Sequence, residues 1–229
     1  MERLHNGFTL QLCDGSFPLS TDSIALAAFA KLPKQAKVLD LGAGCATLGM
    51  LLCAQYDDCH ITGIEIDKNA HTAALQNALD NKVDCRYESI CADMHDIASL
   101  VKAGSFDICI SNPPYFSGGF QHKQYSTARQ ETACTTESVF SAAAWALRYG
   151  GDFYLVHRPE RLAELCALGA KYTLEPKRLL LLRHREDGPV SLILLQCRKG
   201  GKPGLIWEEA SLHTKSGDPT AYYRKLYHL

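Results

Sequence analysis

The class of fold is indicated first by an apolar run that ends in a glycine-rich turn, Lys37-Val38-Leu39-Asp40-Leu41-Gly42-Ala43-Gly44. Its apolar run predicts a short β-strand over 37–41 that breaks at Gly42. Gly42 and Gly44 permit a tight turn and let a ligand approach the backbone. A helix is expected to follow over 48–54. In an open α/β sheet the ligand lies beyond the carboxyl ends of the strands, so this turn is the first candidate binding position.

The same alternation of strand and helix continues along the chain. Further strands are expected over 61–66, 106–111, 153–156, 179–182 and 190–197, and one more is expected to end at Cys91. Further helices are expected over 24–29, 67–79, 135–148 and 159–168. Alternating strands and helices predict a mostly parallel sheet with helices on both faces. Only a short Arg/Gly/Pro segment separates the last two strands, so they are expected to form an antiparallel hairpin. The predicted fold class is therefore α/β and Rossmann-like, with a seven-stranded, mostly parallel sheet and a C-terminal antiparallel hairpin.

Length and composition are those of one globular α/β domain. The chain has 229 residues, of which 46% are hydrophobic and 21% charged, and these are ordinary values for a protein with a packed core. We divide it into an N-terminal strand and helix over 1–36, a main domain over 37–200 and a C-terminal tail over 201–229. No apolar run reaches the length of a membrane span and the first residues lack an export pattern, so a cytoplasmic protein is expected.

Cysteine spacing and net charge narrow the classes of function. The ten cysteines include no Cys-x-x-Cys pair and no Cys/His cluster at zinc spacing, so we expect no metal and interpret them as structural. The formal net charge of −1 argues against a large nucleic-acid footprint. Basic residues cluster at Lys177-Arg178, at Arg183-His184-Arg185 and at Arg198-Lys199 with Lys202, and such clusters are usually solvated surface.

Asp40 before the glycines and Thr47 after them decide between two cofactors. A dinucleotide fingerprint needs a third glycine three residues after Gly44, and this chain has Thr47 there. The pattern therefore favours an S-adenosylmethionine loop over an NAD loop. Asp40, Gly42 and Gly44 are the cofactor-binding candidates of this loop, which accommodates the methionine portion and the ribose.

Acidic residues follow the next two strands. Glu65 lies 21 residues after Gly44, where a carboxylate can accept hydrogen bonds from both ribose hydroxyls. Asp67 is better explained as a helix cap. Asp93 follows the third strand and is expected to accept a hydrogen bond from the adenine amino group of the cofactor. The ordered series of glycine turn, Glu65 and Asp93 predicts one cofactor site.

The motif Asn112-Pro113-Pro114-Tyr115 follows the fourth strand directly. Two consecutive prolines make a rigid, extended segment. An amide-like or exocyclic nitrogen is a poor nucleophile because its lone pair is delocalised. The Asn112 side-chain oxygen and the Pro113 carbonyl can accept its two N–H groups and turn the lone pair toward a methyl group. Tyr115 can stack on the planar target, and Asn112 is also expected to border the cofactor.

Residues 38–115 resemble the amino-methyltransferases that carry an Asn/Asp-Pro-Pro-Tyr/Phe motif, and the chain is most similar to the bacterial tRNA(Val) adenine-37 N6-methyltransferase family. The further matches are Phe17-Pro18-Leu19-Ser20-Thr21-Asp22, Asn112-Pro113-Pro114-Tyr115-Phe116 and His157-Arg158-Pro159-Glu160-Arg161-Leu162. The resemblance implies a class I methyltransferase sheet and adenine as the target. It also implies that Thr21 and Asp22 close over the methionine end of the cofactor and that Phe116 joins Tyr115 at the substrate.

The polar loop over 117–134 comes directly after this motif. Loops of this length in compact domains are often functional. Lys123 and Arg129, with His122 and Tyr125, give it the side chains to hold phosphates around an extruded base, and we assign Lys123 and Arg129 to the substrate. A surface loop without function is the alternative at this point.

Three functions remain open from the sequence. The first is an S-adenosylmethionine-dependent N6-adenine methyltransferase acting on RNA, with anticodon-loop adenine 37 of tRNA as the expected target. The second is an N-methyltransferase that uses the same motif on protein glutamine or an rRNA base; release-factor-type enzymes usually add a helical N-terminal domain, and only about 36 residues precede the first strand here. The third is a non-enzymatic cofactor- or RNA-binding scaffold, which the intact motif disfavours because binding alone does not need it.

Overall fold

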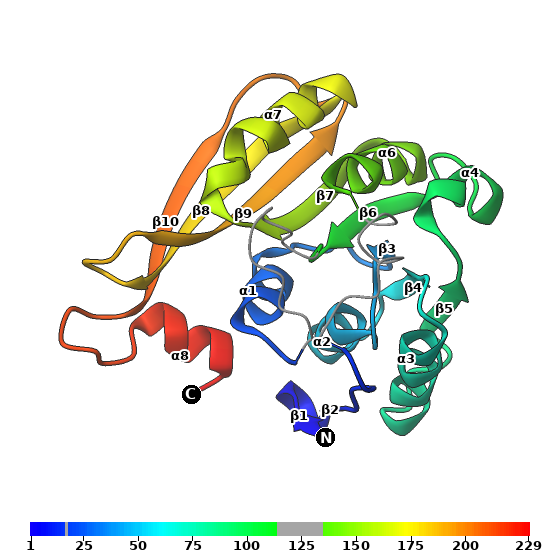
Figure 1. Ribbon diagram of the computed structural model, residues 1–229, viewed down its shortest axis with the longest axis horizontal. Helices are drawn as coiled ribbons and strands as arrows, with labels where there is room; N and C mark the ends of the chain where they lie inside the picture. Colours follow the sequence, from blue (N-terminus) through cyan, green and yellow to red (C-terminus); the bar gives the residue numbers. More distant parts are fainter. Residues whose placement is uncertain (17, 114–134) are drawn as a thin grey trace.

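The computed structural model describes residues 1–16, 18–113 and 135–229 of the chain. Its centre is an eight-stranded sheet in the order β10-β8-β9-β7-β6-β3-β4-β5, and a separate hairpin, β1-β2, lies near the N-terminus (Figure 1). The strands are β1 (Glu2–Arg3), β2 (Thr9–Leu10), β3 (Lys37–Leu41), β4 (His60–Glu65), β5 (Tyr87–Cys91), β6 (Phe106–Ser111), β7 (Leu147–His157), β8 (Leu174–Arg185), β9 (Val190–Lys199) and β10 (Ile206–His213).

Helices cover both faces of this sheet. They are α1 (Thr21–Phe29), α2 (Thr47–Gln55), α3 (Lys68–Asp80), α4 (Ile97–Leu100), α6 (Thr136–Ala146), α7 (Leu162–Lys171) and α8 (Ala221–Tyr227), with short 3-10 turns η1 (His5–Gly7), η2 (Met94–Asp96) and η3 (Pro159–Arg161). Helices α1, α2, α3 and α8 contribute to the hydrophobic core on one face, and α4, α6 and α7 to the core on the other (Figure 1). The predicted α/β fold class is confirmed.

The strand directions follow the prediction. Strands β7, β6, β3, β4 and β5 are mutually parallel, so their carboxyl ends share one edge of the sheet. Strand β9 is antiparallel to both β7 and β8, which is the predicted hairpin. Val38 and Leu39 point to opposite faces and neither is exposed. A strand buried on both faces requires the continuous apolar run that the sequence shows at 37–41.

The sheet has one strand more than the seven predicted. Strand β10 pairs in parallel with β8 along the outer edge, from Ile206 opposite Arg178 onward. Its pattern is weak because it is an edge strand: Ile206 and Trp207 are each 61% exposed, and Leu212 is its only buried residue. The predicted C-terminal tail therefore supplies both a strand and, through α8, part of the core.

The helix expected over 135–148 ends at Ala146, and β7 begins at the next residue. The glycines expected to close that helix lie inside the strand instead. Gly150 has a φ of +79°, and a Cβ on Gly151 would lie 2.8 Å from the carbonyl oxygen of Asp107. They accommodate an irregular start of β7, where its register with β6 shifts.

Asn77 of α3 and Asn81, the C-cap that follows this helix, hold the N-terminal segment. Asn81 accepts from the Thr9 N–H and donates to the Thr9 carbonyl, both at 2.8 Å. Asn77 makes the same pair of bonds with Gln11, at 2.7 and 2.9 Å. Each amide side chain therefore takes the place of a peptide group in a neighbouring strand. Asn77 also donates to the Cys45 carbonyl at 2.9 Å, so it links the N-terminal segment to the glycine turn.

Candidate active site

The predicted residues gather at the carboxyl edge of the parallel strands. The glycine turn follows β3, Glu65 ends β4, Asp93 comes two residues after β5, and Asn112 follows β6. Because β3 pairs with both β4 and β6, the glycine turn lies between Glu65 and Asn112. The glycine turn and three residues predicted from separate parts of the sequence therefore lie along one edge of the sheet, where ligands bind in open α/β sheets.

The glycine turn has the backbone shape that only glycine adopts without strain. Gly42 has a φ of +73° and Gly44 a φ of +56°. The N–H groups of Gly42 and Ala43 both donate to the Ile64 carbonyl at 3.0 Å, which ties the turn to the end of β4. A Cβ on Gly44 would meet no described atom within 4 Å. Position 44 therefore requires glycine because of its backbone conformation and not for lack of space, and the space beside it is open to a ligand.

Glu65 is a buried carboxylate that organises this turn. It is 9% exposed, and its Oε2 accepts from the Gly44 N–H and its Oε1 from the Asp67 N–H, both at 2.8 Å. Burial raises the pKa of Glu65, and the two N–H groups lower it only in part. Asp67 caps α3 by accepting from the Asn69 and Ala70 N–H groups, which confirms the predicted cap. Each Glu65 oxygen has a second lone pair for a further donor.

Asp40 is buried beneath the same turn. It is 1% exposed, and neither carboxylate oxygen has a hydrogen-bond partner among the described residues. Burial, and next the nearby Glu65 carboxylate, raise the pKa of Asp40 to about 7. A buried carboxylate without a partner is costly. Asp40 is therefore suited to a ligand that brings a positive charge or hydrogen-bond donors to this place.

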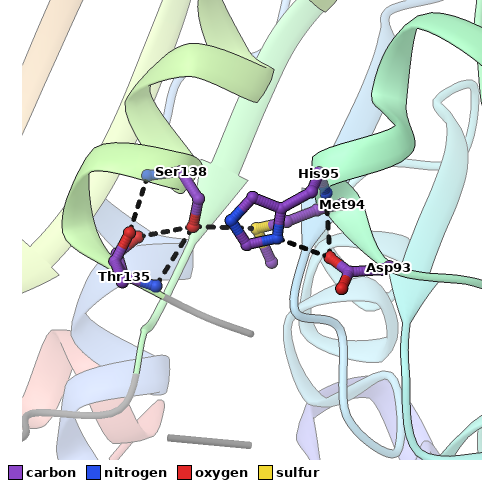
Figure 2. Close-up of polar contacts among 5 residues, drawn as sticks. All are labelled: Asp93, Met94, His95, Thr135 and Ser138. Atoms are coloured by element: carbon purple, nitrogen blue, oxygen red, sulfur yellow. Dashed lines mark hydrogen bonds and ion pairs between the residues drawn. The ribbon is translucent and has the colours of Figure 1, made fainter. Parts of the chain in front are cut away.

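Asp93 follows β5 and caps the η2 turn (Figure 2). Its Oδ1 accepts from the His95 N–H at 2.9 Å and lies 2.7 Å from His95 Nδ1. No described residue bonds to Oδ2, which leaves that oxygen for the predicted adenine contact. The Asp93 side chain is half-buried, so it can reach a ligand at the edge of the site.

Met94 separates the glycine turn from α6. A Cβ on Gly42 would lie 3.8 Å from Met94 Cε, and Ser138 Oγ lies 3.9 Å from Met94 Sδ (Figure 2). Thr135 and Ser138 form a capping box that begins α6 at this point. An apolar thioether next to Asp93 is suited to the flat face of an adenine ring.

Asn112 occupies the end of β6. Its Nδ2 donates to Ser23 Oγ of α1 at 2.9 Å. Ser111, the preceding residue, donates from its hydroxyl to the Leu41 carbonyl at 2.8 Å and so holds the end of β6 against β3. Pro113 is buried. The other predicted substrate residues, Pro114, Tyr115, Phe116, Lys123 and Arg129, lie outside the described residues.

Thr21 and Asp22 form the first turn of α1, where Ser20 is the N-cap. The Thr21 hydroxyl shares a 2.8 Å hydrogen bond with the Tyr227 hydroxyl of α8. Thr21 therefore connects the C-terminal helix to the start of α1. Asp22 is half-buried in the same turn, and its predicted contact with a cofactor stays a prediction.

Several site residues carry no local signal and were not predicted. Ser16 Oγ lies 3.0 Å from Cys45 Sγ, and Cys13 Sγ lies 3.6 Å from the same sulfur, so the N-terminal segment also contacts the glycine turn. Ser23 and Asn77 were likewise missed. The partners of these residues lie 29 to 89 positions away in the chain, and no short motif records such contacts.

The basic clusters interpreted as surface are partly brought together, away from the strand-end site. Lys177, Arg178 and Arg198 line one open hollow of about 440 Å³ with Gln196. Arg178 pairs with Glu208, and Arg198 pairs with Asp152 near the start of β7. The two guanidinium groups are therefore already neutralised by carboxylates.

The described residues form neither a candidate metal site nor a candidate membrane span. Among residues 1–16, 18–113 and 135–229, no three His, Cys, Asp or Glu side chains are grouped so as to hold a metal ion. No helix within these ranges is long and apolar enough to cross a membrane. The nine cysteines that the structure describes are free thiols.

Comparison with known proteins gives both a family and relatives. The family model described as "Methyltransferase small domain" matches residues 20–166, more than half of the chain. A tRNA1(Val) (adenine(37)-N6)-methyltransferase of Shewanella halifaxensis is 34% identical over 159 residues, and the match covers 69% of this chain and 64% of that protein. A protein of the same name from Photobacterium profundum is 27% identical over 209 residues, covering 90% of this chain and 87% of that protein. The chain thus spans just under two thirds of the first relative and most of the second.

Solved structures share the fold. A predicted O-methyltransferase, Atu636 from Agrobacterium tumefaciens, has a TM-score of 0.76 at 22% identity over 91% of this chain and 96% of that one. The 16S rRNA N2 G1207 methyltransferase of T. thermophilus, solved with AdoMet and guanosine, has a TM-score of 0.56 at 21% identity over 80% of this chain and 44% of that one. At such identities the likeness shows the fold alone. From the family match, the chain belongs to the methyltransferase small domain family and is a class I S-adenosylmethionine-dependent methyltransferase, as the sequence predicted.

Proposed function

We propose that this enzyme transfers a methyl group from S-adenosylmethionine to the N6 amino group of adenine 37 in the anticodon loop of a tRNA. The observation that carries the proposal is the place of Asn112, which begins an Asn-Pro-Pro sequence at the strand end beside the glycine turn. The names of the Shewanella and Photobacterium relatives support adenine 37 as the target.

The described residues fit the charged parts of the cofactor. We assign its methionine ammonium to Asp40, whose buried carboxylate has no described partner. We assign the ribose hydroxyls to Glu65, whose two oxygens each accept one N–H and can accept one more donor. Thr21 and Asp22, at the start of α1, are assigned to the methionine end of the cofactor.

The adenine of the cofactor is assigned to the neighbouring strand end. Asp93 Oδ2 would accept a hydrogen bond from its amino group, and Met94 would lie against its ring. When bound, the cofactor supplies an electrophilic methyl group. Residues 1–36 are proposed to close this site, which the bonds from Asn77 to Gln11 and to Cys45 support. Residues 37–200 form the methyltransferase domain in this proposal, with 201–229 packed on it.

Asn112 and Pro113 act on the target nitrogen. Their oxygens accept its two N–H groups, so the lone pair points at the methyl carbon and the pyramidal transition state is favoured. Asn112 and Pro113 would keep the nitrogen in this orientation toward the methyl group that the cofactor supplies, and the methylated nitrogen would lose a proton to solvent. No general base with a shifted pKa is needed. Tyr115 and Phe116 are proposed to hold the base, and Lys123 and Arg129 the flanking phosphates.

A protein-glutamine N5 amide also presents two N–H groups on a planar nitrogen, so it is the second candidate target. Labelled methyl transfer from the cofactor to bulk tRNA, bulk rRNA and total protein, run in parallel, separates the two. Label in tRNA, recovered as N6-methyladenosine, is the expected result. Label only in protein would indicate that the substrate is a protein glutamine and not RNA. Label only in rRNA would indicate that the target is a base of rRNA.

A further inference from the structure

Two cysteines meet where the N-terminal segment reaches the glycine turn. Cys45 Sγ lies 3.6 Å from Cys13 Sγ and accepts a hydrogen bond from the Cys13 N–H at 3.5 Å. The Ser16 hydroxyl contacts both sulfurs, at 2.8 Å from Cys13 and 3.0 Å from Cys45. The sulfurs of a disulfide are about 2.05 Å apart. The two thiols are therefore close enough to join after a small movement of their side chains.

Asn77 keeps the two backbones next to each other. Its side chain bonds to the N–H and the carbonyl of Gln11, two residues before Cys13, and also to the Cys45 carbonyl. Asn77 itself is 1% exposed, so it is fixed in the core. The contact between the two sulfurs thus follows from an anchored backbone arrangement and not from the chance meeting of two mobile side chains.

The stretch over 12–16 is joined to the glycine turn through sulfur. Among the described residues, every hydrogen bond from this stretch to the rest of the molecule involves Cys45 Sγ. A thiol is a weak donor and a weak acceptor. Thr9 and Gln11, which precede the stretch, are each held by two bonds to an asparagine amide. Residues 12–16 are therefore the part of the N-terminal segment that leaves the glycine turn most readily.

We propose that Cys13 and Cys45 are a site of reversible oxidation, whose disulfide fixes the N-terminal segment on the glycine turn and slows the exchange of the cofactor. The sulfurs move little when they join, so the oxidised segment keeps the place that it has beside the turn. The inference rests on the proposed closing of the site by residues 1–36, and it is independent of the methyl acceptor.

A small disulfide such as oxidised glutathione is the oxidant in this proposal. Cys13 is half-buried and Cys45 is 2% exposed, so Cys13 reacts first. Its thiol loses a proton, its sulfur attacks one sulfur of the oxidant, and one glutathione thiolate leaves. The Cys45 thiol then loses its proton and attacks Cys13 Sγ, and the second glutathione thiolate leaves. Two cysteine thiols are thus oxidised to one disulfide, and the glutathione disulfide is reduced to two thiols that take up the two protons.

Peptide mass spectrometry and ligand release test the proposal together. Burial raises the pKa of the Cys13 thiol, so the wild-type enzyme is oxidised overnight at about pH 8.5, where more thiolate is present. A peptide pair linked through Cys13 and Cys45 is the expected product. Labelled S-adenosylhomocysteine bound to the enzyme is then displaced by excess unlabelled ligand. Its release should be about tenfold slower after oxidation, because the segment can no longer leave the turn, and dithiothreitol should restore the original rate.

Two single changes are the matched controls. Cys13→Ser removes one member of the pair, and Cys166→Ser removes an exposed thiol of α7 on the other face of the sheet. Oxidised glutathione should slow release in Cys166→Ser as it does in the wild type, and it should leave release unchanged in Cys13→Ser. Equal slowing in both variants would overturn the proposal, because a glutathione group on another thiol would then be responsible.

Two results in the wild type would also overturn the proposal. One is the absence of the linked peptide pair from the oxidised, folded enzyme, and the other is a linked pair with an unchanged rate of release. No RNA enters these assays, so such a failure is distinct from a failure of the tRNA assignment, which labelled methyl transfer measures.

Discussion

Because Asp40 is buried, both the free energy of unfolding and the affinity for the cofactor should depend on pH. The Asp40 carboxylate is 1% exposed and has no described hydrogen-bond partner, and burial raises its pKa from the ordinary 3.8 to about 7. The tests are a pH titration of the wild type and the variant Asp40→Asn, which keeps the shape and removes the titrating group.

The sign of the effect on stability follows from the raised pKa. Between about pH 4 and pH 7 the folded protein binds a proton that the unfolded chain has released. The free energy of unfolding without cofactor should therefore fall as pH rises through this window, by up to about 1.4 kcal/mol per pH unit. Asp40→Asn should remove most of this slope, and the slope that remains belongs to groups such as Glu65, whose pKa is also raised.

The effect on cofactor binding has the opposite sign. A cofactor ammonium beside Asp40 favours the ionised carboxylate, so binding releases a proton below about pH 7. Because binding requires Asp40 to lose its proton, the affinity for the cofactor should fall by about 25-fold when the pH is lowered from 7.5 to 5.5. Calorimetric titration in two buffers of different ionisation enthalpy counts the protons released. An affinity and proton count independent of pH, or unchanged in Asp40→Asn, would refute the assignment of Asp40 to the ammonium.

Three further changes act on other parts of the site. Asn112→Ala should keep the fold and cofactor affinity and lower turnover by about 10²- to 10³-fold, as for one lost transition-state hydrogen-bond partner; near-normal methylation by a folded variant would contradict its catalytic role. Glu65→Ala should weaken cofactor binding by about 10- to 150-fold, from roughly 1.5–3 kcal/mol of hydrogen bonding to a charged group, and unchanged binding in calorimetry would move the ribose elsewhere. Replacing Lys123 and Arg129 together by Ala should weaken tRNA binding and flatten its salt dependence, because fewer counterions are released. The control is the double change of Lys177 and Arg178 to Ala, for which a smaller effect is expected; an equal salt slope in the wild type and the Lys123/Arg129 variant would exclude phosphate contacts by that pair.

The parts of the site that sequence predicts are those carried by local patterns. The glycine turn, the Asp67 cap and the strand ends that bear Glu65 and Asn112 follow from residues adjacent in the chain. Strand β10 was not predicted from the sequence because an exposed edge strand lacks the buried, alternating pattern on which strand prediction depends.

Contacts between distant segments could not be predicted in the same way. Ser23 and Asn77 act through partners 32 to 89 positions away, and the side chains alone do not show which partner each will meet. The early end of α6 has a similar cause. Gly151 was interpreted as a helix terminator, but its role depends on the approach of the Asp107 carbonyl from the neighbouring strand.

The proposed function requires that the site at the end of β6 methylates N6 of one adenine in tRNA. The direct measurement incubates the wild-type enzyme and labelled S-adenosylmethionine with a tRNA1(Val) transcript and with the same transcript carrying guanine at position 37. Nucleoside mass spectrometry then quantifies N6-methyladenosine. Close to one N6-methyladenosine per tRNA is expected in the first transcript and none in the second. Equal methylation of both transcripts would contradict adenine 37 as the target, and methylation of neither by an enzyme that labels protein would contradict the RNA substrate itself.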